Sequence, residues 1–463
     1  MRNRTTTALF FGFTCLFSIL KVNAQIELPS IFGSNMVLQR NNDVSIWGSG
    51  PAKSQIVVTT SWNGSTYTTK TDKEGSWKLK VKTKNAGGPY QVDISNGDET
   101  VSLENVMIGE VWVCSGQSNM ERPLKGAGND PVIGANEAIL RSENPNIRFF
   151  KVKNEKSSEP KIDFSGEWES CSRATAPDFS ATGYFFGNLV QDIIDVPVGL
   201  IASDWGATRI QFWMDEGSLN KFDPEDHKNS AATLFNGMIH PMLGFNIRGV
   251  VWYQGESNRY NPGIYKDMMV EMVKGWRAKW GIGEFPFYYC QIAPYKYTNE
   301  VNTALLREAQ LMASKEIPNS GMACLLDAGD ENFIHPSKKR IAGERLAYLA
   351  LKNTYGVSGI HAEGPQFVEM KIDSSSVELT FDKKLTSFGK ELKLFELAGE
   401  DKKFYPAQAV IHRNTVIVTS EDVLKPIAAR YGFKNFVDGD LFDRYGIPAS
   451  SFRTDNWEAD TGL

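Results

Sequence analysis

The chain has 463 residues, of which 41% are hydrophobic and 23% charged, and its formal net charge is −5. This length exceeds that of one ordinary domain, so two or three domains are expected. The acidic balance and the lack of any Lys/Arg-rich block argue against nucleic acid and anionic membrane surfaces as partners.

Residues 1–24 are predicted to be a secretory signal peptide. Arg2 and Arg4 precede the apolar run ALFFGFTCLFSIL, and Val22 and Ala24 suit the last positions before a cleavage site. The apolar run is shorter than the ~20 residues that a bilayer-spanning helix needs. We therefore expect an exported protein, periplasmic or extracellular, without stable membrane insertion.

Residues 25–105 consist of short segments rich in β-branched and aromatic residues. VSIWGSG, QIVVTTSW and SWKLKVKT are examples, and turns containing Gly, Asn, Asp or Pro separate them. This spacing is typical of a small all-β sandwich. We expect an N-terminal β-sandwich domain here.

Residues 106–355 show a different pattern, in which apolar strand-like runs alternate with helical stretches. The runs include VWVCS, VPVGLIAS and RGVVWYQ, and Met269, Met272 and Trp276 recur at the spacing of one helix face. Strands that alternate with helices predict a parallel sheet covered on both faces, an α/β fold. Residues 356–463 return to β-type segments and predict a C-terminal β-rich domain.

The cysteines give no sign of a metal site. Cys114, Cys290 and Cys324 each fall in a predicted buried strand, where a free thiol behaves as a small hydrophobic group. No CxxC motif or His/Cys cluster is present, so we expect neither a metal nor another cofactor.

Four loops carry polar residues that could meet at one edge of the predicted sheet. They contain Ser118, residues 203–209, residues 253–258, and residues 327–336 with His335. Ligands bind beyond the carboxyl ends of the strands in open parallel sheets, where such loops converge. Acyl transfer needs a hydroxyl, a base, a group that orients the base, and oxyanion donors. Ser118 and His335 could supply the hydroxyl and the base.

The surroundings of Ser118 fit this chemistry in part. Gly116 permits a sharp turn before the serine, although Met120 replaces the second glycine of the G-x-S-x-G pattern. The backbone amides of Ser118 and Gly206 and the side chain of Gln254 are candidate oxyanion donors. A serine between a strand and a helix is also a common helix cap, so this position alone is weak support for catalysis.

Together, four segments resemble the sialate O-acetylesterase group of the SGNH hydrolases, which is related to acetylxylan esterases. The segments are GEVWVCSGQSNM, DWGATRIQFWM, GVVWYQGESN and DAGDENFIHPSKKRIAGERLA; NMVLQR, WGSGP and FRTDNW extend the likeness over nearly the whole mature chain. The resemblance implies an SGNH-type three-layer α/β/α catalytic domain. It also implies a secreted esterase that removes O-acetyl groups from a carbohydrate, with sialic acid as the expected sugar, through a serine acyl-enzyme.

The resemblance also implies roles for individual residues. Ser118 would be the nucleophile, His335 the general base, and Gly206 an oxyanion donor. Gln254 would take the place of the Asn that other SGNH enzymes use as a second donor. His240, in GMIHPM, is the rival candidate for the base.

The carboxylate that orients His335 is where this sequence departs from the common pattern. Many SGNH enzymes have an Asp three residues before the histidine, and this chain has Asn332 there. Relatives with the QGE motif carry a glutamate that can orient the histidine, here Glu256. Asp330, five residues before His335, is the alternative.

The second motif also suggests substrate-binding residues. Arg209 could pair with a carboxylate, and Gln211 and Trp213 could line the cleft, where an indole can stack on a sugar. Trp213 is equally compatible with a place in the core. Two other functions stay open: an acetylxylan esterase, and a non-catalytic glycan-binding protein, which Asn332 in place of a carboxylate would suit.

Overall fold

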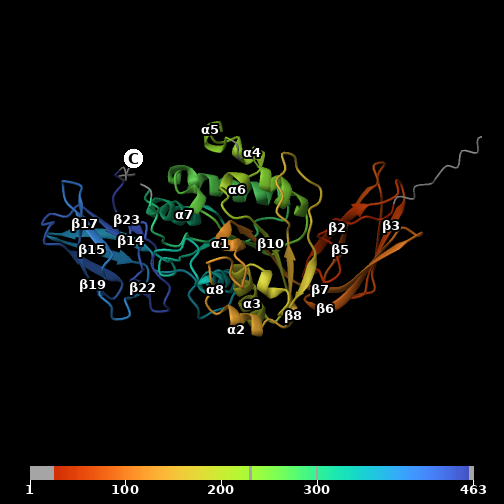
Figure 1. Ribbon diagram of the computed structural model, residues 1–463, viewed down its shortest axis with the longest axis horizontal. Coiled ribbons are helices and arrows are strands. Elements are labelled where there is room, and N and C mark those ends of the chain that lie inside the picture. Colours follow the sequence, from red (N-terminus) through yellow and green to blue (C-terminus); the bar gives the residue numbers. More distant parts are fainter. Residues whose placement is uncertain (1–24, 229–231, 299–300, 458–463) are drawn as a thin grey trace, which may run out of the picture.

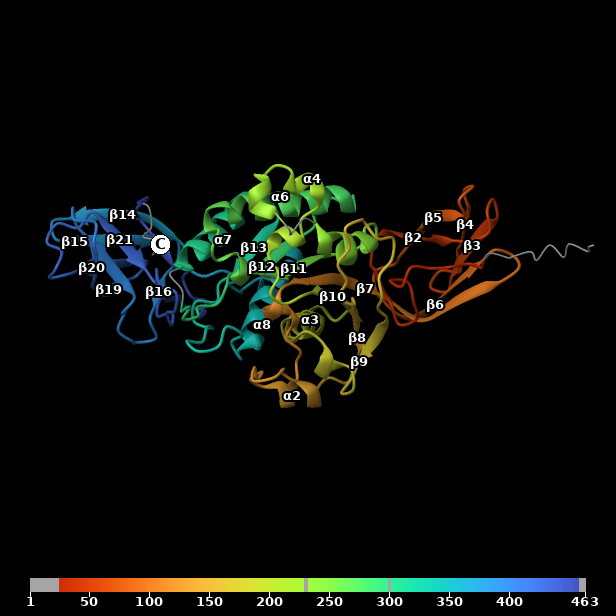
Figure 2. The same ribbon diagram turned by 45° about the horizontal axis from the view of Figure 1, so that its top comes forward.

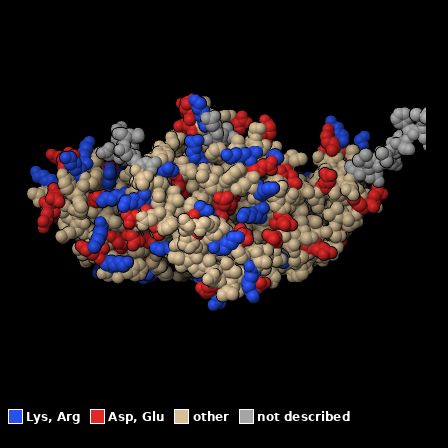
Figure 3. All heavy atoms as spheres, viewed as in Figure 1, with Lys and Arg blue, Asp and Glu red and all other residues tan. Residues whose placement is uncertain are grey.

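The computed structural model describes residues 25–228, 232–298 and 301–457, so the predicted signal peptide lies outside the described residues. Three parts lie in a row: N-terminal strands, a central α/β part and C-terminal strands (Figure 1). No helix in the described part of the chain is long and apolar enough to cross a membrane. Basic and acidic side chains are interspersed over the face of the molecule drawn in Figure 3.

The central part is built on a sheet whose strands run in the order β13-β12-β11-β7-β10-β8-β9. All neighbours in it are parallel except β8 and β9, which are antiparallel. β10 and β11 are buried along their whole length, as expected for strands with both faces covered. The strands are β7 (Thr100–Gly116), β8 (Asn144–Lys151), β9 (Trp168–Cys171), β10 (Val198–Asp204), β11 (Gly249–Tyr253), β12 (Phe287–Cys290) and β13 (Ser320–Ala323).

Helices cover both faces of this sheet (Figure 2). Val111 and Val113 of β7 belong to the core that contains Trp276 of α6 (Pro262–Trp280) and residues of α7 (Ala304–Glu316). Trp112 and Cys114 point to the opposite core, with α3 (Ala181–Ile194) and α8 (Lys339–Leu349). The predicted three-layer α/β fold is confirmed. The shorter helices are α1 (Ser118–Glu121), α2 (Ala135–Leu140), α4 (Glu216–Leu219) and α5 (Pro224–His227).

The N-terminal strands are joined to the central sheet through β7. The first part of β7 pairs with β1 and β6, and its last part pairs with β10 and β11. The boundary predicted between residues 105 and 106 therefore falls inside one continuous strand. The other N-terminal strands are β1 (Val37–Gln39), β2 (Asp43–Ser49), β3 (Gln55–Thr60), β4 (Thr66–Lys70), β5 (Ser76–Lys82) and β6 (Gly87–Ser95).

The C-terminal strands form sheets of their own around a separate core. Arg307 of α7 is buried and joins them to the central part: its guanidinium donates to Gly432 O at 3.2 Å and to Ser451 Oγ at 3.0 Å. The strands are β14 (Phe367–Asp373), β15 (Ser376–Phe381), β16 (Leu385–Thr386), β17 (Phe395–Ala398), β18 (Phe404–Pro406), β19 (Gln408–His412), β20 (Thr415–Thr419), β21 (Ala428–Tyr431), β22 (Phe442–Asp443) and β23 (Phe452–Arg453).

The four cysteines of the described residues, Cys114, Cys171, Cys290 and Cys324, are buried free thiols. This burial was predicted for Cys114, Cys290 and Cys324. Burial raises the pKa of the Cys171 thiol to about 12, which keeps it protonated and unreactive at neutral pH.

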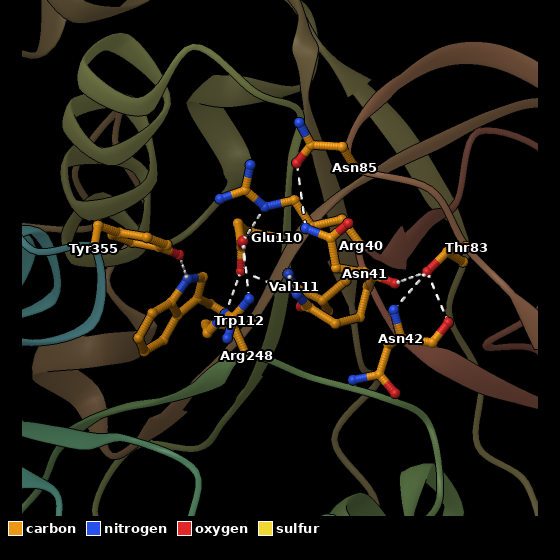
Figure 4. A network of polar contacts seen from close by, with 11 residues as sticks. Arg40, Asn41, Asn42, Thr83, Asn85, Glu110, Val111, Trp112, Arg248 and Tyr355 are labelled. Carbon is orange, nitrogen blue, oxygen red and sulfur yellow. Dashed lines mark hydrogen bonds and ion pairs between the residues drawn. The ribbon is translucent and has the colours of Figure 1, made fainter.

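A buried carboxylate joins the N-terminal strands to the central sheet (Figure 4). Glu110 of β7 is fully buried and accepts hydrogen bonds from Gln39 Nε2 at 3.0 Å, Arg40 Nε at 2.5 Å and Arg248 Nε at 2.5 Å. Arg40 follows β1 and Arg248 precedes β11. One charge thus holds three strands in register, since charge-assisted hydrogen bonds are the stronger kind.

We predict that Glu110→Gln lowers the free energy of unfolding by about 3 kcal/mol, because two partly buried guanidinium groups lose their counter-charge. Urea unfolding followed by circular dichroism measures the change. Glu74→Gln is the control, since the ion pair of Glu74 with Lys73 is exposed and should contribute little. Equal stability of the two variants would contradict the prediction.

Candidate active site

The turn that carries Ser118 is made possible by Gly116. Gly116 has a φ of 135°, and a Cβ atom at this position would lie 2.2 Å from Tyr253 O. The amide of Gln117 donates to Tyr253 O at 2.9 Å, and the amide of Trp205 donates to Gly116 O at 3.1 Å. The chain therefore leaves β7 tightly packed between the ends of β10 and β11. This turn delivers Ser118 to the carboxyl edge of the sheet as the first residue of α1.

Ser118 and His335 meet at this edge. His335 Nε2 lies 2.9 Å from Ser118 Oγ, although 217 positions separate the two residues. His335 precedes α8 and is mostly buried, with 16% of its side chain exposed. His240, the rival base, has Nδ1 2.8 Å from Lys161 O. The structure brings together the predicted serine and the predicted histidine.

Asp130 occupies the position that orients the imidazole. Its Oδ2 lies 2.9 Å from His335 Nδ1, and Arg122 Nη2 is 2.8 Å from the same oxygen. A carboxylate only accepts hydrogen bonds, so a bond between Nδ1 and Asp130 requires the proton on Nδ1. Arg122 Nη2 also lies 3.1 Å from Nδ1. The lone pair of Nε2 then faces the hydroxyl of Ser118. The sequence did not reveal Asp130, which lies in the loop between α1 and α2 and follows no recognised spacing.

The two carboxylates expected to orient His335 lie elsewhere. Glu256 is buried and accepts from Asn119 Nδ2 at 2.5 Å. Asp330 Oδ1 accepts from the backbone amides of Asn332 at 2.8 Å and Phe333 at 3.1 Å, so it stabilises the turn of its own loop. Among the described residues, neither carboxylate contacts His335. The geometry replaces both with Asp130.

Gly206 lies beside the serine, as expected of an oxyanion donor. A Cβ atom at Gly206 would lie 3.3 Å from Ser118 Cβ. Its amide, however, donates to Glu121 Oε2 at 2.8 Å, and Asn154 Nδ2 donates to the other oxygen of Glu121 at 3.2 Å. The structure records no acceptor for the Ser118 amide among the described residues. Of the two backbone donors, only that of Ser118 is therefore available in this conformation.

Gln254 is used to hold the neighbouring loop. Its Nε2 donates to Thr208 O at 3.1 Å and to Asn258 Oδ1 at 2.7 Å, and its Oε1 accepts from Tyr265 at 2.9 Å. Both amide hydrogens are thus engaged within the buried interior. The expected oxyanion role of Gln254 is not supported, because no donor of its side chain is left for a ligand.

Of the predicted substrate-binding residues, two lie in the interior. Gln211 is buried and accepts from Asn258 Nδ2 at 2.9 Å. Trp213 is fully buried and packs edge-to-face against Trp252, with ring centroids 5.9 Å apart. Arg209 is half-buried and precedes the turn Ile210–Phe212, so it stays the candidate among the three.

The charges around the site favour a neutral histidine. Burial lowers the pKa of His335, the positive charge of Arg122 lowers it further, and Asp130 opposes both effects. An imidazole that is neutral at neutral pH can accept a proton from Ser118. No group of His, Cys, Asp and Glu that could hold a metal ion occurs among the described residues.

Comparison with known proteins adds independent information. Residues 108–352 match a family described as carbohydrate esterase, sialic acid-specific acetylesterase. The chain is 28% identical to a sialate O-acetylesterase of Rattus norvegicus and 27% identical to one of Homo sapiens; the matches cover 80% of this chain and 82% and 80% of those proteins. The crystal structure of a carbohydrate acetylesterase from Xanthomonas citri superposes with a TM-score of 0.87 at 34% identity, over 93% of this chain and 100% of that one.

Asp204, at the end of β10, gives a pH-dependent test of this region. Burial and the negative charge of Glu121 raise its pKa to about 8. The unfolded carboxyl ionises near pH 4. The folded protein therefore binds an extra proton between these values, and the stability cost of Asp204 grows as the pH rises towards 8.

We predict that Asp204→Asn raises the melting temperature more at pH 8 than at pH 5. The amide removes the destabilisation caused by the raised pKa of the buried carboxyl, and this destabilisation is small at pH 5. Differential scanning calorimetry at the two pH values measures this difference. Asp192→Asn, an exposed carboxylate on α3, serves as control. If Asp204→Asn raised the melting temperature by the same amount at pH 5 and pH 8, the raised pKa of Asp204 would be contradicted.

Proposed function

This chain belongs to the sialic acid-specific acetylesterase family of carbohydrate esterases, and from that premise we propose that it hydrolyses O-acetyl esters of sugars through a serine acyl-enzyme. The observation that carries the proposal is the chain of contacts from Ser118 Oγ to His335 Nε2, and from His335 Nδ1 to Asp130 Oδ2, each 2.9 Å long. Nucleophile, base and orienting carboxylate are the parts of a serine hydrolase triad.

In the first half of the reaction, Ser118 Oγ attacks the acetyl carbonyl carbon while His335 Nε2 takes the hydroxyl proton. Asp130 stabilises the imidazolium that forms, and Arg122 holds the Asp130 carboxylate in place through an ion pair. The amide of Ser118 donates to the oxyanion of the tetrahedral intermediate. The ester C–O bond then breaks, and the sugar oxygen leaves as a hydroxyl with the proton that His335 held.

In the second half, His335 takes a proton from water, and the resulting nucleophile attacks the acetyl group on Ser118. Collapse of this intermediate breaks the bond to Ser118 Oγ, which recovers its proton from His335. Acetate leaves, and the free enzyme is restored. Only water is consumed besides the ester, so the cycle requires no cofactor.

We propose an O-acetylated sialic acid as the substrate, and acetylated xylan as the alternative. The family description and the rat and human relatives support sialate. Arg209 is the residue we assign to the carboxylate of such a sugar, because a guanidinium pairs well with that group. A purely glycan-binding role is less well supported, since binding alone does not need a serine and a histidine in hydrogen-bonding contact.

We also propose that residues 1–24 direct export and are removed. Arg2 and Arg4, the apolar run and Ala24 support this. Residues 25–105 and 356–463 would then be accessory β domains on either side of a catalytic domain of residues 106–355, with β7 shared across the first boundary.

We predict that Ser118→Ala lowers acetate release from 4-nitrophenyl acetate and from O-acetylated sialic acid by at least about 10³-fold, since the nucleophile is lost. Ser115→Ala is the matched control: Ser115 is buried near the end of β7, the strand that leads to Ser118, and its hydroxyl has no partner among the described residues. Circular dichroism verifies that both variants fold.

Substantial turnover by the Ser118 variant would overturn the serine mechanism. A wild-type protein that binds acetylated glycans without releasing acetate would favour the glycan-binding alternative.

A further inference from the structure

Three buried polar side chains lie directly behind the serine and are not used in the proposed reaction. Asn119 Nδ2 donates to Glu256 Oε1 at 2.5 Å, and Lys339 Nζ donates to Asn119 Oδ1. The three come from α1, from the turn that follows β11, and from the start of α8. Their exposed fractions are only 1% for Asn119, 3% for Glu256 and 2% for Lys339. We refer to this trio as the amide clamp.

The amide clamp connects the two halves of the proposed catalytic pair. Asn119 follows Ser118 in the chain, and its Nδ2 also donates to Ile334 O at 3.2 Å, next to His335. Its backbone carbonyl accepts from Thr182 Oγ1 at 3.0 Å, which fixes α1 against α3. One side-chain amide therefore links the helix that carries the nucleophile to the loop that carries the base.

We propose that Glu256 and Lys339 are positioning residues that act through Asn119: their opposite charges lock the orientation of its amide, and the locked amide holds the loop of His335 at hydrogen-bonding distance from Ser118. The carboxylate faces the NH₂ end of the amide and the ammonium faces the oxygen end. A flipped amide would place its oxygen against Glu256 and its NH₂ against Lys339. It would also remove the donor that reaches Ile334 O. The proposal rests on the esterase function proposed above.

The two charges depend on each other because both are desolvated. Burial raises the pKa of Glu256, and the positive charge of Lys339 opposes this. Burial lowers the pKa of Lys339 to about 7, and the negative charge of Glu256 opposes this. Among the described residues, neither side chain hydrogen-bonds to Ser118 or His335, so the positioning effect passes through Asn119. The positive charge of Lys339 also lowers the pKa of His335 directly. Glu256, the glutamate of the QGESN segment, is therefore assigned a positioning role in place of the role of the carboxylate that orients His335.

The test compares Glu256→Gln and Lys339→Met with wild type in hydrolysis of 4-nitrophenyl acetate, below the melting temperature of every variant. We expect kcat to fall by about 10- to 100-fold, the range known for residues that orient the ligands of catalytic metals, taken here as a guide. KM should change by less than about 3-fold, because the clamp does not contact the substrate. Glu110→Gln is the matched control: it also neutralises a buried glutamate between cations, but the partners of Glu110 are Gln39, Arg40 and Arg248, outside the site, so kcat should stay unchanged.

The double variant Glu256→Gln/Lys339→Met separates positioning from stability. We expect its melting temperature to recover relative to the single variants, since no unpaired charge stays buried. Its kcat should stay low, since a neutral Gln can accept or donate and no longer selects one orientation of Asn119. Recovery of kcat together with stability, or a loss in Glu256→Gln no larger than in Glu110→Gln, would overturn the proposal. Failure of the esterase function would look different, because the wild type itself would release no acetate.

Discussion

The arrangement of the site depends on β7 and on how closely its last residue, Gly116, approaches β11. β7 runs for 17 residues from the N-terminal strands into the centre of the α/β sheet. At its end only a glycine fits, because a side chain at Gly116 would collide with the backbone of Tyr253. The amide of Gln117 then bonds to β11, so the position of Ser118 is tied to two central strands. In the mechanism proposed above, a serine held in this way would need little reorganisation before it attacks.

Buried charges then decide which carboxylate does what. Glu110 lies between two arginines and joins β1, β7 and β11. Asp130 lies between Arg122 and His335, with its Oδ2 in contact with both. Glu256 is desolvated and has Lys339 as the compensating charge across Asn119. Burial and the negative charge of Glu121 drive Asp204 towards its neutral form, although the positive charge of Lys151 opposes this. The function of each acid therefore follows from its partner.

Much of this could be predicted from the sequence. Strand and helix periodicity predicted the α/β sheet, and the four motifs predicted the family and the meeting of Ser118 with His335, because parallel strands deliver their loops to one edge. The continuity of β7 could not be predicted in the same way. Polar Glu104 and Asn105 interrupt its apolar pattern, and Asn105 has a φ of 55°, so this stretch is typical of a turn between two strands.

The roles of the remaining site residues depend on which side chains are buried, and this cannot be read from a single sequence. Gln254 and Trp213 stand in motif segments, yet both pack into the interior, where both side chains donate hydrogen bonds to Thr208. Asp130 lies in a Gly-rich loop whose path is set by contacts distant in sequence, so its approach to His335 had no local signal. Asp330 accepts a hydrogen bond from the Asn332 amide within the turn before His335. The carboxylate that contacts the imidazole therefore comes from another loop.

The central claim is that Asp130 orients His335 towards Ser118. Steady-state hydrolysis of 4-nitrophenyl acetate by Asp130→Asn, with Asp330→Asn as its matched partner, tests this claim most directly. We predict that kcat falls on the order of 10³- to 10⁴-fold for Asp130→Asn, because the imidazolium loses its counter-charge, and changes by less than about 2-fold for Asp330→Asn. Near-wild-type turnover by Asp130→Asn, or a comparable loss in Asp330→Asn, would contradict it.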